Sequence, residues 1–279
     1  MTRAAITSIV VGILGATGCA QHGMVDDGTT VAYGRTFAGL LRNGAELPPN
    51  GDGYHVPKRW VRRGNQYGTD ELITLIVRVG RRIEREADSS IGIADLSPQT
   101  GGPTIWHRSH QTGRDVDVLM FAVDSRGRSL KSDAMVRFKD DGSSHPKDSH
   151  GNHPSKRQFD VERNWMLVRA FIEEPTVQVQ YIYVYEPLER LLIEHAREID
   201  EPTGLIEHAA ALMEQPIDSS KHDDHFHFRI YCPTSDRALG CEDGYVREWH
   251  KKLYKYGWDV LVASARVAAL AIKIASVML

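Results

Sequence analysis

In KHDDHFHFRIYC, residues 221–232, polar and apolar side chains alternate from His225 onward at the two-residue period of a β-strand. His225, His227 and Arg229 share one face of that strand, and Phe226 and Phe228 share the other. The phenylalanines can pack into a core, which leaves the histidines facing a cleft or solvent. Residues two apart on a strand lie roughly 6.5–7 Å from each other. Two imidazoles at that distance can bind one metal ion, or one can bind it while the other acts on a water molecule.

A second polar cluster precedes another predicted strand. WHRSHQTGRDVDVLMF, residues 106–121, contains His110, Gly113 and Asp117, with Val116 and Val118 on the opposite face from Asp117. His and Asp are both zinc ligands, and Gly allows the turn between them to close tightly. Two such sets at strand ends predict one metal ion held between strands, and three protein ligands would leave a fourth position for water. The alternative is two unrelated polar turns, with Asp117 capping another element.

The rest of the pattern predicts an α+β fold. Thr69 and Asp70 can cap a helix whose apolar residues recur at helical spacing as far as Ile83. Further helices are predicted at 165–172, 188–198 and 204–214, and further strands at 90–97, 115–123 and 177–186. Because these elements follow no strict βαβ order, we expect a central, mainly antiparallel sheet that carries the zinc site and is flanked by helices. No linker divides residues 50–245, which predicts a single domain.

Residues 1–19 are typical of an export signal rather than of a folded segment. They contain an early Arg3, an apolar stretch and small residues before Cys19, and they are too short and wrongly flanked for a membrane-spanning helix. The end of this segment resembles a bacterial lipobox, in which the cysteine is acylated; the alternative is an ordinary signal cut near the same residues. Residues 20–49 are predicted to be a tether. We therefore expect a protein of the periplasm or cell envelope, and lipidation at Cys19 would make it an outer-membrane lipoprotein.

The last segment, residues 246–279, is predicted to be an apolar helical tail. Between residues 260 and 279 only Arg266 and Lys273 are charged, and their spacing puts them on one face of a helix. This favours a helix at the membrane surface, which with a lipid on Cys19 would give two anchors. The alternative is a helix that docks on the protein's own core or on a second copy. The formal net charge of −3, without a long block of one sign, argues against a nucleic-acid partner.

The cysteines divide according to the predicted export. The chain has three, and Cys19 leaves with the signal or carries its lipid. Cys232 and Cys241 remain, an even number in an oxidising compartment, and they bracket a short turn-rich loop. This predicts a disulfide between them; the alternative is two free thiols.

The two histidine clusters together resemble a known group of enzymes. The combination of His110-x-x-Gly113-x-x-x-Asp117 with His225-x-His227 resembles the zinc peptidases that include lysostaphin-type enzymes, D-Ala-D-Ala peptidases and the hedgehog signalling domain. More closely, SHQTGRDVD followed by HxxHFH and then Cys-Pro resembles the penicillin-insensitive murein endopeptidases, from about residue 50 to 245. The polar segment 124–160 and the apolar tail depart from that family.

The resemblance implies a role for each clustered residue. It implies His110, Asp117 and His227 as zinc ligands and His107 as an accessory or second-site ligand. It implies His225 and His222 as the catalytic histidines, with His225 as the candidate base for water and His222 steadying the developing oxyanion or sharing the proton. Separately, Asp115 shares a strand face with Asp117 and could orient an imidazole, or it could be a solvated carboxylate at the strand edge.

The expected function is therefore a zinc endopeptidase that cuts D-alanyl amide cross-links of peptidoglycan, with the D-alanyl-to-diaminopimelate bond as the one the resemblance implies. β-Lactams should not inhibit it, because no acylating serine takes part. One alternative is a carboxypeptidase or dipeptidase acting on uncrosslinked D-Ala ends. An alternative of another class is a non-catalytic, zinc-containing module that binds the cell wall; His225 and His222 argue against it, since a purely structural zinc site has no use for them.

Overall fold

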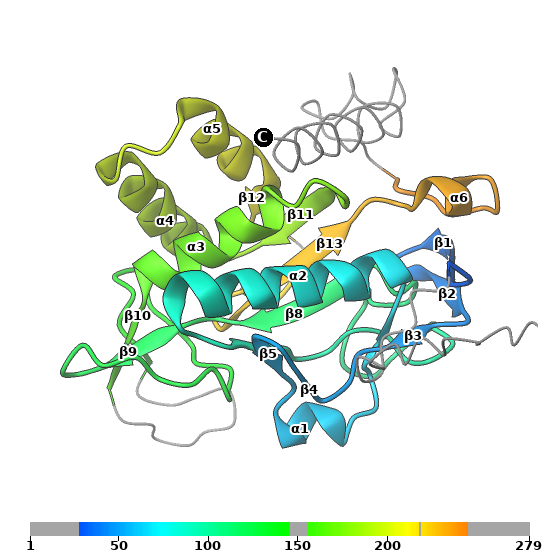
Figure 1. The fold of residues 1–279 in the computed structure, drawn as a ribbon, viewed down its shortest axis with the longest axis horizontal. Helices are drawn as coiled ribbons and strands as arrows, with labels where there is room; N and C mark the ends of the chain where they lie inside the picture. Colours follow the sequence, from blue (N-terminus) through cyan, green and yellow to red (C-terminus); the bar gives the residue numbers. More distant parts are fainter. Residues whose placement is uncertain (1–27, 146–155, 218, 245–279) are drawn as a thin grey trace, which may run out of the picture.

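The centre of the fold is a four-stranded sheet with the strand order β12-β11-β13-β8 (Figure 1). Its strands are β8 (Asp115–Leu119), β11 (Val179–Tyr183), β12 (Met213–Glu214) and β13 (His225–Ile230). β13 pairs antiparallel with β8 and β11, and only β12 runs parallel to its neighbour. The computed structural model describes residues 28–145, 156–217 and 219–244. The α+β prediction with a mainly antiparallel sheet is confirmed.

The apolar side of β13 packs against helices. Phe226 and Phe228 are fully buried, and the ring of Phe171 from α3 (Val161–Ile172) stacks on Phe228 with 3.8 Å between the centroids. Figure 1 shows α2 (Asp70–Ala87) and α3 lying across the same side of the sheet. Burying a phenylalanine side chain contributes roughly 1.5–3 kcal/mol, so this face fixes the position of β13 and hence of its histidines.

The long helix α2 forms as the sequence pattern predicts. The Thr69 hydroxyl caps it by accepting a hydrogen bond from the backbone N–H of Leu72, and Asp88, in the left-handed conformation, ends it. The five apolar residues predicted for its inner face are all buried: Leu72, Ile73, Ile76, Val79 and Ile83. Helices α4 (Glu186–Glu198) and α5 (Thr203–Leu212) pack beyond α3, and Pro187 occupies the first turn of α4.

Short elements surround this core. The hairpin β1 (Val31–Arg35) with β2 (Ala38–Arg42) lies next to α6 (Thr234–Arg237), and β9 (Ala122–Asp124) pairs with β10 (Arg157–Phe159) (Figure 1). The remaining short elements are β3 (Ala45–Glu46), β4 (Asn50–Gly51), β5 (Tyr54–His55), α1 (Lys58–Val61), β6 (Tyr67–Gly68) and β7 (Ile91–Gly92). Of the helices in the described ranges, none is both long and apolar enough to span a membrane.

Three sequence predictions differ from the structure. The folded domain begins before residue 50, because strands β1 to β3 lie within the predicted tether and Ala32, Leu41 and Leu47 are buried. The strand predicted at 90–97 is reduced to the two residues of β7, followed by an extended segment that forms an isolated bridge at Ile93 with β8. The helix predicted at 204–214 stops at Leu212, because the next two residues form β12. Cys19 and the predicted tail lie outside the described residues.

Candidate metal centre

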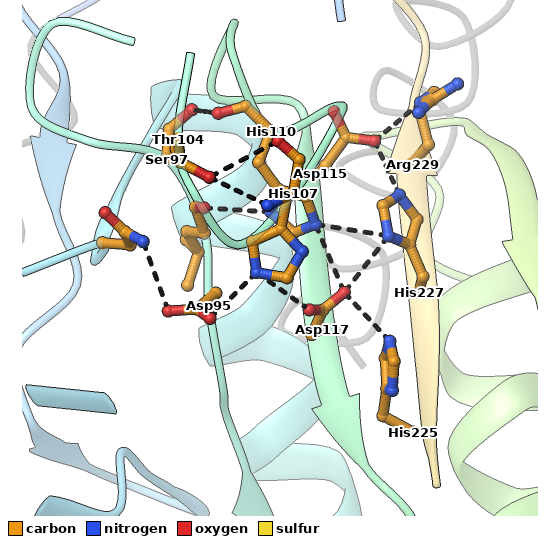
Figure 2. Close-up of polar contacts among 12 residues, drawn as sticks. Asp95, Ser97, Thr104, His107, His110, Asp115, Asp117, His225, His227 and Arg229 are labelled. Atoms are coloured by element: carbon orange, nitrogen blue, oxygen red, sulfur yellow. Dashed lines mark hydrogen bonds and ion pairs between the residues drawn. The ribbon is translucent and has the colours of Figure 1, made fainter. Parts of the chain in front are cut away.

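The register between β8 and β13 sets the candidate centre. His227 lies directly opposite Asp117 in this antiparallel pair, and the Nδ1 atom of His227 is 3.1 Å from Oδ1 of Asp117. Both side chains project from the polar side of the sheet (Figure 2). Sequence periodicity predicts the face on which each residue lies, whereas the pairing that brings these two together appears only in the structure.

His110 reaches the same point from the loop before β8. Its backbone is in the left-handed region with φ 64°, and Gly113 follows with φ 70°. A side chain at Gly113 would collide with Leu41 and the backbone of Thr69, so the predicted tight glycine turn is present. The Ser97 hydroxyl donates to the backbone carbonyl of His110, which fixes the loop.

One ring nitrogen of His110 is hydrogen-bonded to the backbone, and the other faces the candidate metal centre. Nδ1 lies 2.9 Å from the carbonyl oxygen of Leu96, which accepts its hydrogen. Nε2 is then 3.3 Å from Oδ1 of Asp117 and 3.2 Å from Nδ1 of His227. A histidine whose other nitrogen is held by a carbonyl has a fixed tautomer and ring orientation, as metal-binding histidines do.

His227 is oriented in the same manner by a carboxylate. Its Nε2 donates to Oδ1 of Asp115 across 2.8 Å, and the same oxygen accepts from Nε of Arg229 at 2.6 Å. Asp115 is fully buried, which excludes a solvated carboxylate at the strand edge. Its contact with His227 is the orienting contact that the sequence suggested as the other possibility. Burial alone would raise the pKa of Asp115, but Arg229 and His227 hold that pKa below its usual value.

Asp117 supplies the test of whether the centre suits a cation. Both of its carboxylate oxygens are buried and lack a hydrogen bond among the described residues. Burial opposes its ionisation, yet the nearby imidazoles of His225, His110 and His107 hold the pKa of Asp117 well below the usual value. A buried, ionised carboxylate surrounded by imidazole nitrogens and left without hydrogen bonds fits a divalent cation.

His107 forms a second edge of the centre. Its Nε2 is 3.7 Å from Oδ2 of Asp117 and 2.9 Å from Oδ2 of Asp95, a buried residue that also pairs with Arg63. The nitrogen and oxygen atoms that His107, His110 and Asp117 would offer to a metal all lie within 4.8 Å of one another. The residues present therefore offer two overlapping ligand sets, which share His110 and Asp117 and differ in His227 or His107.

His225 lies at the open side of the centre. Its Nδ1 is 2.6 Å from Oδ1 of Asp224, its Nε2 is 3.5 Å from Oδ1 of Asp117, and its side chain is 16% exposed. Burial lowers the pKa of His225, but Asp117 and Asp224 outweigh burial and raise that pKa to about 9. A cation bound to Asp117 would oppose this increase, because it would cancel the negative charge that contributes most to it.

His222 completes the histidine group. Its ring centroid is 5.2 Å from that of His225 and 5.9 Å from that of His227. Burial, together with the charge of His225 and His227, lowers the pKa of His222 to about 2, so that this imidazole stays neutral near pH 7. Its backbone N–H donates to Oε1 of Gln215, which positions the turn before β13.

The end of β13 is fixed by the predicted disulfide. Cys232 and Cys241 are bonded, with 5.9 Å between their Cα atoms, so the disulfide prediction is confirmed. Nearby, the buried Arg114 pairs with Asp243 at 2.9 Å, and Asp243 also accepts a hydrogen bond from the backbone N–H of Cys232. These contacts attach the segment after the strand to the start of β8.

Three polar residues of the centre were not identified from sequence. Asp95 lies in an apolar stretch with no histidine beside it, so no ligand-like spacing pointed to it as part of the centre. Asp224 directly precedes His225 and could have been noticed as a carboxylate adjacent to a candidate base. Tyr183, whose hydroxyl accepts from Nη1 of Arg229 at 3.1 Å, comes from β11 and gave no sequence signal.

Comparison with known proteins gives the class. The family model for penicillin-insensitive murein endopeptidases matches residues 32–248. A penicillin-insensitive murein endopeptidase of Haemophilus influenzae is 25% identical over 225 residues, which cover 78% of this chain and 68% of that protein. One from Klebsiella pneumoniae is 29% identical over 119 residues, or 41% of this chain and 43% of that protein. The fold and the histidine-rich centre are thus those of a peptidase. The chain belongs to the penicillin-insensitive murein endopeptidase family, which acts on the cell wall.

Proposed function

We propose that the protein is a zinc endopeptidase that hydrolyses D-alanyl amide cross-links in bacterial peptidoglycan. The observation that carries this proposal is the buried Asp117 carboxylate, which lacks hydrogen bonds among the described residues and faces the nitrogens of His110 and His227 at 3.1–3.3 Å. Nε2 of His110, Asp117 and Nδ1 of His227 would hold the ion, and His107 would be the accessory ligand. Zinc suits two imidazoles and a carboxylate, and three such ligands are typical of catalytic rather than structural zinc sites.

The chain's own residues would move the proton. When bound, zinc supplies Lewis acidity, which lowers the pKa of water and polarises a carbonyl group. His225 is the proposed proton carrier, since Asp224 holds its Nδ1 and its Nε2 points toward Asp117. From that position Nε2 can accept a proton from water and later deliver one to the leaving amine. His222, held beside it by Gln215, would steady the developing negative charge or share the proton.

Digestion of purified muropeptide dimers tests the reaction. Monomers as products, identified by mass, would support cleavage of the cross-link, and the mass of each fragment identifies the bond that is cut. Loss of a terminal D-alanine from uncrosslinked peptides, with dimers left intact, would replace the proposal by a carboxypeptidase. Binding of peptidoglycan with no product of either kind would indicate a non-catalytic wall-binding module. Adding a β-lactam at saturating concentration should leave the rate unchanged.

The metal requires its own measurement. Elemental analysis of the purified protein should find one zinc per chain. Removal of the metal by a chelator should abolish cleavage, and added zinc should restore it. The cell envelope is the proposed location, with peptidoglycan as the substrate and Cys19 as the proposed lipid attachment.

A further inference from the structure

A cavity lies beside the turn that leads into β13. Its volume is about 560 Å³, and its polar lining includes Arg137, Lys139, Asp140, Tyr185, Lys221 and Asp223. Two of these residues directly precede or follow the proposed catalytic His222. None of them belongs to the metal centre, so the cavity is a separate feature next to that centre along the chain.

Arg137 is held rigidly at this cavity. Its Nε and Nη2 donate to the carboxylate of Asp223, with 3.0 Å between Nη2 and Oδ2. The Asp223 side chain is only 5% exposed, whereas that of Arg137 is 40% exposed. The backbone carbonyl of Asp223 also accepts from the N–H of Phe138, which attaches the segment around Arg137 to the residues before β13. Arg137 thus presents the rest of its guanidinium group to the cavity in a fixed orientation.

Lys221 is positioned by an aromatic ring. Its Nζ donates to the hydroxyl of Tyr185 at 3.0 Å and lies 4.4 Å from the centroid of that ring. The Tyr185 hydroxyl in turn donates to Oδ1 of Asp140 at 2.7 Å. An ammonium group has three donors, and among the described residues only the bond to Tyr185 uses one of them.

Each acidic group of the cavity is paired with a donor of the chain, whereas Arg137 and Lys221 keep donors that have no partner among the described residues. The acidic groups already have donors: Asp223 accepts from Arg137, Asp140 from Tyr185, and Asp141 from both the backbone and the hydroxyl of Ser143. The cavity is therefore suited to a ligand that accepts hydrogen bonds and carries negative charge. A carboxylate fits the fork of an arginine and the point charge of a lysine.

We propose that this cavity binds a free carboxylate of the peptidoglycan stem peptide, with Arg137 and Lys221 as its cationic contacts. The inference rests on the proposed function, because that function makes a stem peptide the substrate. Such peptides offer this group from two sources. In diaminopimelate each amino group is attached to a carbon that also bears a carboxyl group, and a γ-linked glutamate keeps its α-carboxylate. Binding of either carboxylate would position the peptide through a group that is not part of the amide bond to be cut.

Binding of an uncleavable probe tests the inference without turnover. The probe is the tripeptide L-Ala-γ-D-Glu-diaminopimelate, used unmodified, amidated at the glutamate α-carboxylate, or amidated at the side-chain carboxylate of diaminopimelate. Calorimetry with the full-length mature chain would give a Kd for each form. Lys221→Met should weaken binding of the unmodified tripeptide by about tenfold or more, the loss expected for a charge-assisted contact. One amidated form should bind weakly to the unsubstituted protein and be insensitive to Lys221→Met, which identifies the carboxylate.

Matched variants separate binding from folding. Arg137→Gln should weaken binding in the same way, but it leaves Asp223 without its buried partner, so Arg137→Lys, which keeps the charge, accompanies it. Arg126→Gln alters an exposed arginine away from the cavity and should leave every Kd unchanged. An unchanged Kd in folded Lys221→Met and Arg137→Gln, equal affinity for all three peptides, or no binding of the tripeptide would each overturn the inference. Cleavage of dimers by the same protein would then leave the proposed function standing, whereas failure to cleave dimers overturns that function.

Discussion

His227 and Asp115 form a hydrogen bond between neighbouring strands, 2.8 Å from Nε2 to Oδ1, and this bond determines which nitrogen of His227 faces the candidate metal centre. With Nε2 engaged, Nδ1 is the atom that points to Asp117 and His110. Arg229, two residues along the same strand, supplies the positive charge that keeps Asp115 ionised. A strand of six residues thus carries a proposed ligand and the cation that stabilises the orienting carboxylate of that ligand.

Exchanging the two histidines of β13 for alanine should separate metal binding from turnover. His227→Ala should lose zinc and activity together, because it removes a proposed ligand. His225→Ala should keep zinc and lower kcat by about 10²–10⁴-fold, the usual contribution of a positioned general acid or base. Elemental analysis paired with dimer digestion measures both. Zinc retained in His227→Ala but missing from His225→Ala would mean that the two roles are reversed.

Removing the charge of Asp115 should weaken the metal site without touching a ligand. Asp115→Asn leaves His227 in place but disturbs its tautomer, and loss of such an orienting partner typically costs 10–100-fold in metal affinity, roughly the reduction expected here. Competition with a chelator of known affinity measures the change. Arg229 would lose its buried partner, so thermal unfolding must be recorded alongside. Unchanged zinc affinity in a folded Asp115→Asn protein would contradict the orienting role.

The disulfide should stabilise the folded chain modestly. The bond closes a short loop between Cys232 and Cys241, and the chain-entropy model gives about 2–3 kcal/mol for such a loop. Thiol counting on unfolded, unreduced protein should detect neither sulfur. A Cys232→Ser, Cys241→Ser double variant should unfold at lower denaturant concentration with the same slope. Two reactive thiols in protein recovered from the envelope would show that the bond does not form there.

Glu189 on α4 should make stability depend on pH. Burial, with the charges of Glu186 and Glu214, raises the pKa of Glu189 to about 7 in the folded chain, compared with 4.5 for an ordinary glutamate. Between pH 4.5 and 7 the folded state therefore holds a proton on Glu189 that the unfolded chain has released. The contribution of Glu189 to the free energy of unfolding is therefore fully present below pH 4.5 and is lost as the pH rises through 7. Glu189→Gln should unfold less readily than the unsubstituted protein at pH 8 and show little difference at pH 4. Denaturant titrations of both proteins at the two pH values measure the difference in their free energies of unfolding. An equal difference at pH 4 and pH 8 would refute the prediction.

The predicted membrane attachment involves two segments outside the described residues. If Cys19 carries lipid and residues 259–279 form a surface helix, either alone should retain part of the protein on membranes. Fractionation of a Cys19→Ala form, with and without residues 259–279, should show release only when the tail is also deleted. A Cys19→Ala form that is fully soluble with its tail intact would rule out the tail as an anchor.

Sequence periodicity predicted the parts of this fold that bury one face. The alternation of Phe226 and Phe228 with His225 and His227, and the helical spacing of Leu72 to Ile83, each reflect burial against a single core, and both elements formed where expected. The β1–β2 hairpin was missed because most of its residues are exposed or half-buried and two are glycines, so that it carries little periodic signal. Its position is determined instead by contacts with distant segments, such as the bridge between Gly34 and Cys241.

The centre was predicted in its residue types but not in its connections. His110, Asp117 and His227 were singled out as ligands because the two histidine clusters resemble those of a family of zinc peptidases. Asp95 was missed, since its partners His107 and Arg63 are brought to it by loops whose course no local pattern specifies. Hydrogen-bond partners of this kind depend on tertiary packing, which the local pattern of a single sequence does not predict.

The two faces of β13 have a consequence for how such an enzyme can diversify. Every second residue of β13 is buried in the core and the intervening ones belong to the candidate metal centre, so a shift of the strand that moved His225 or His227 would also displace Phe226 and Phe228. The core face of β13 and the candidate metal centre can therefore shift only together. Arg137 and Lys221 lie outside that strand, at the cavity proposed to bind a carboxylate. If the cavity binds a stem peptide, substitution of Lys221 would alter the substrate preference and leave the metal centre intact.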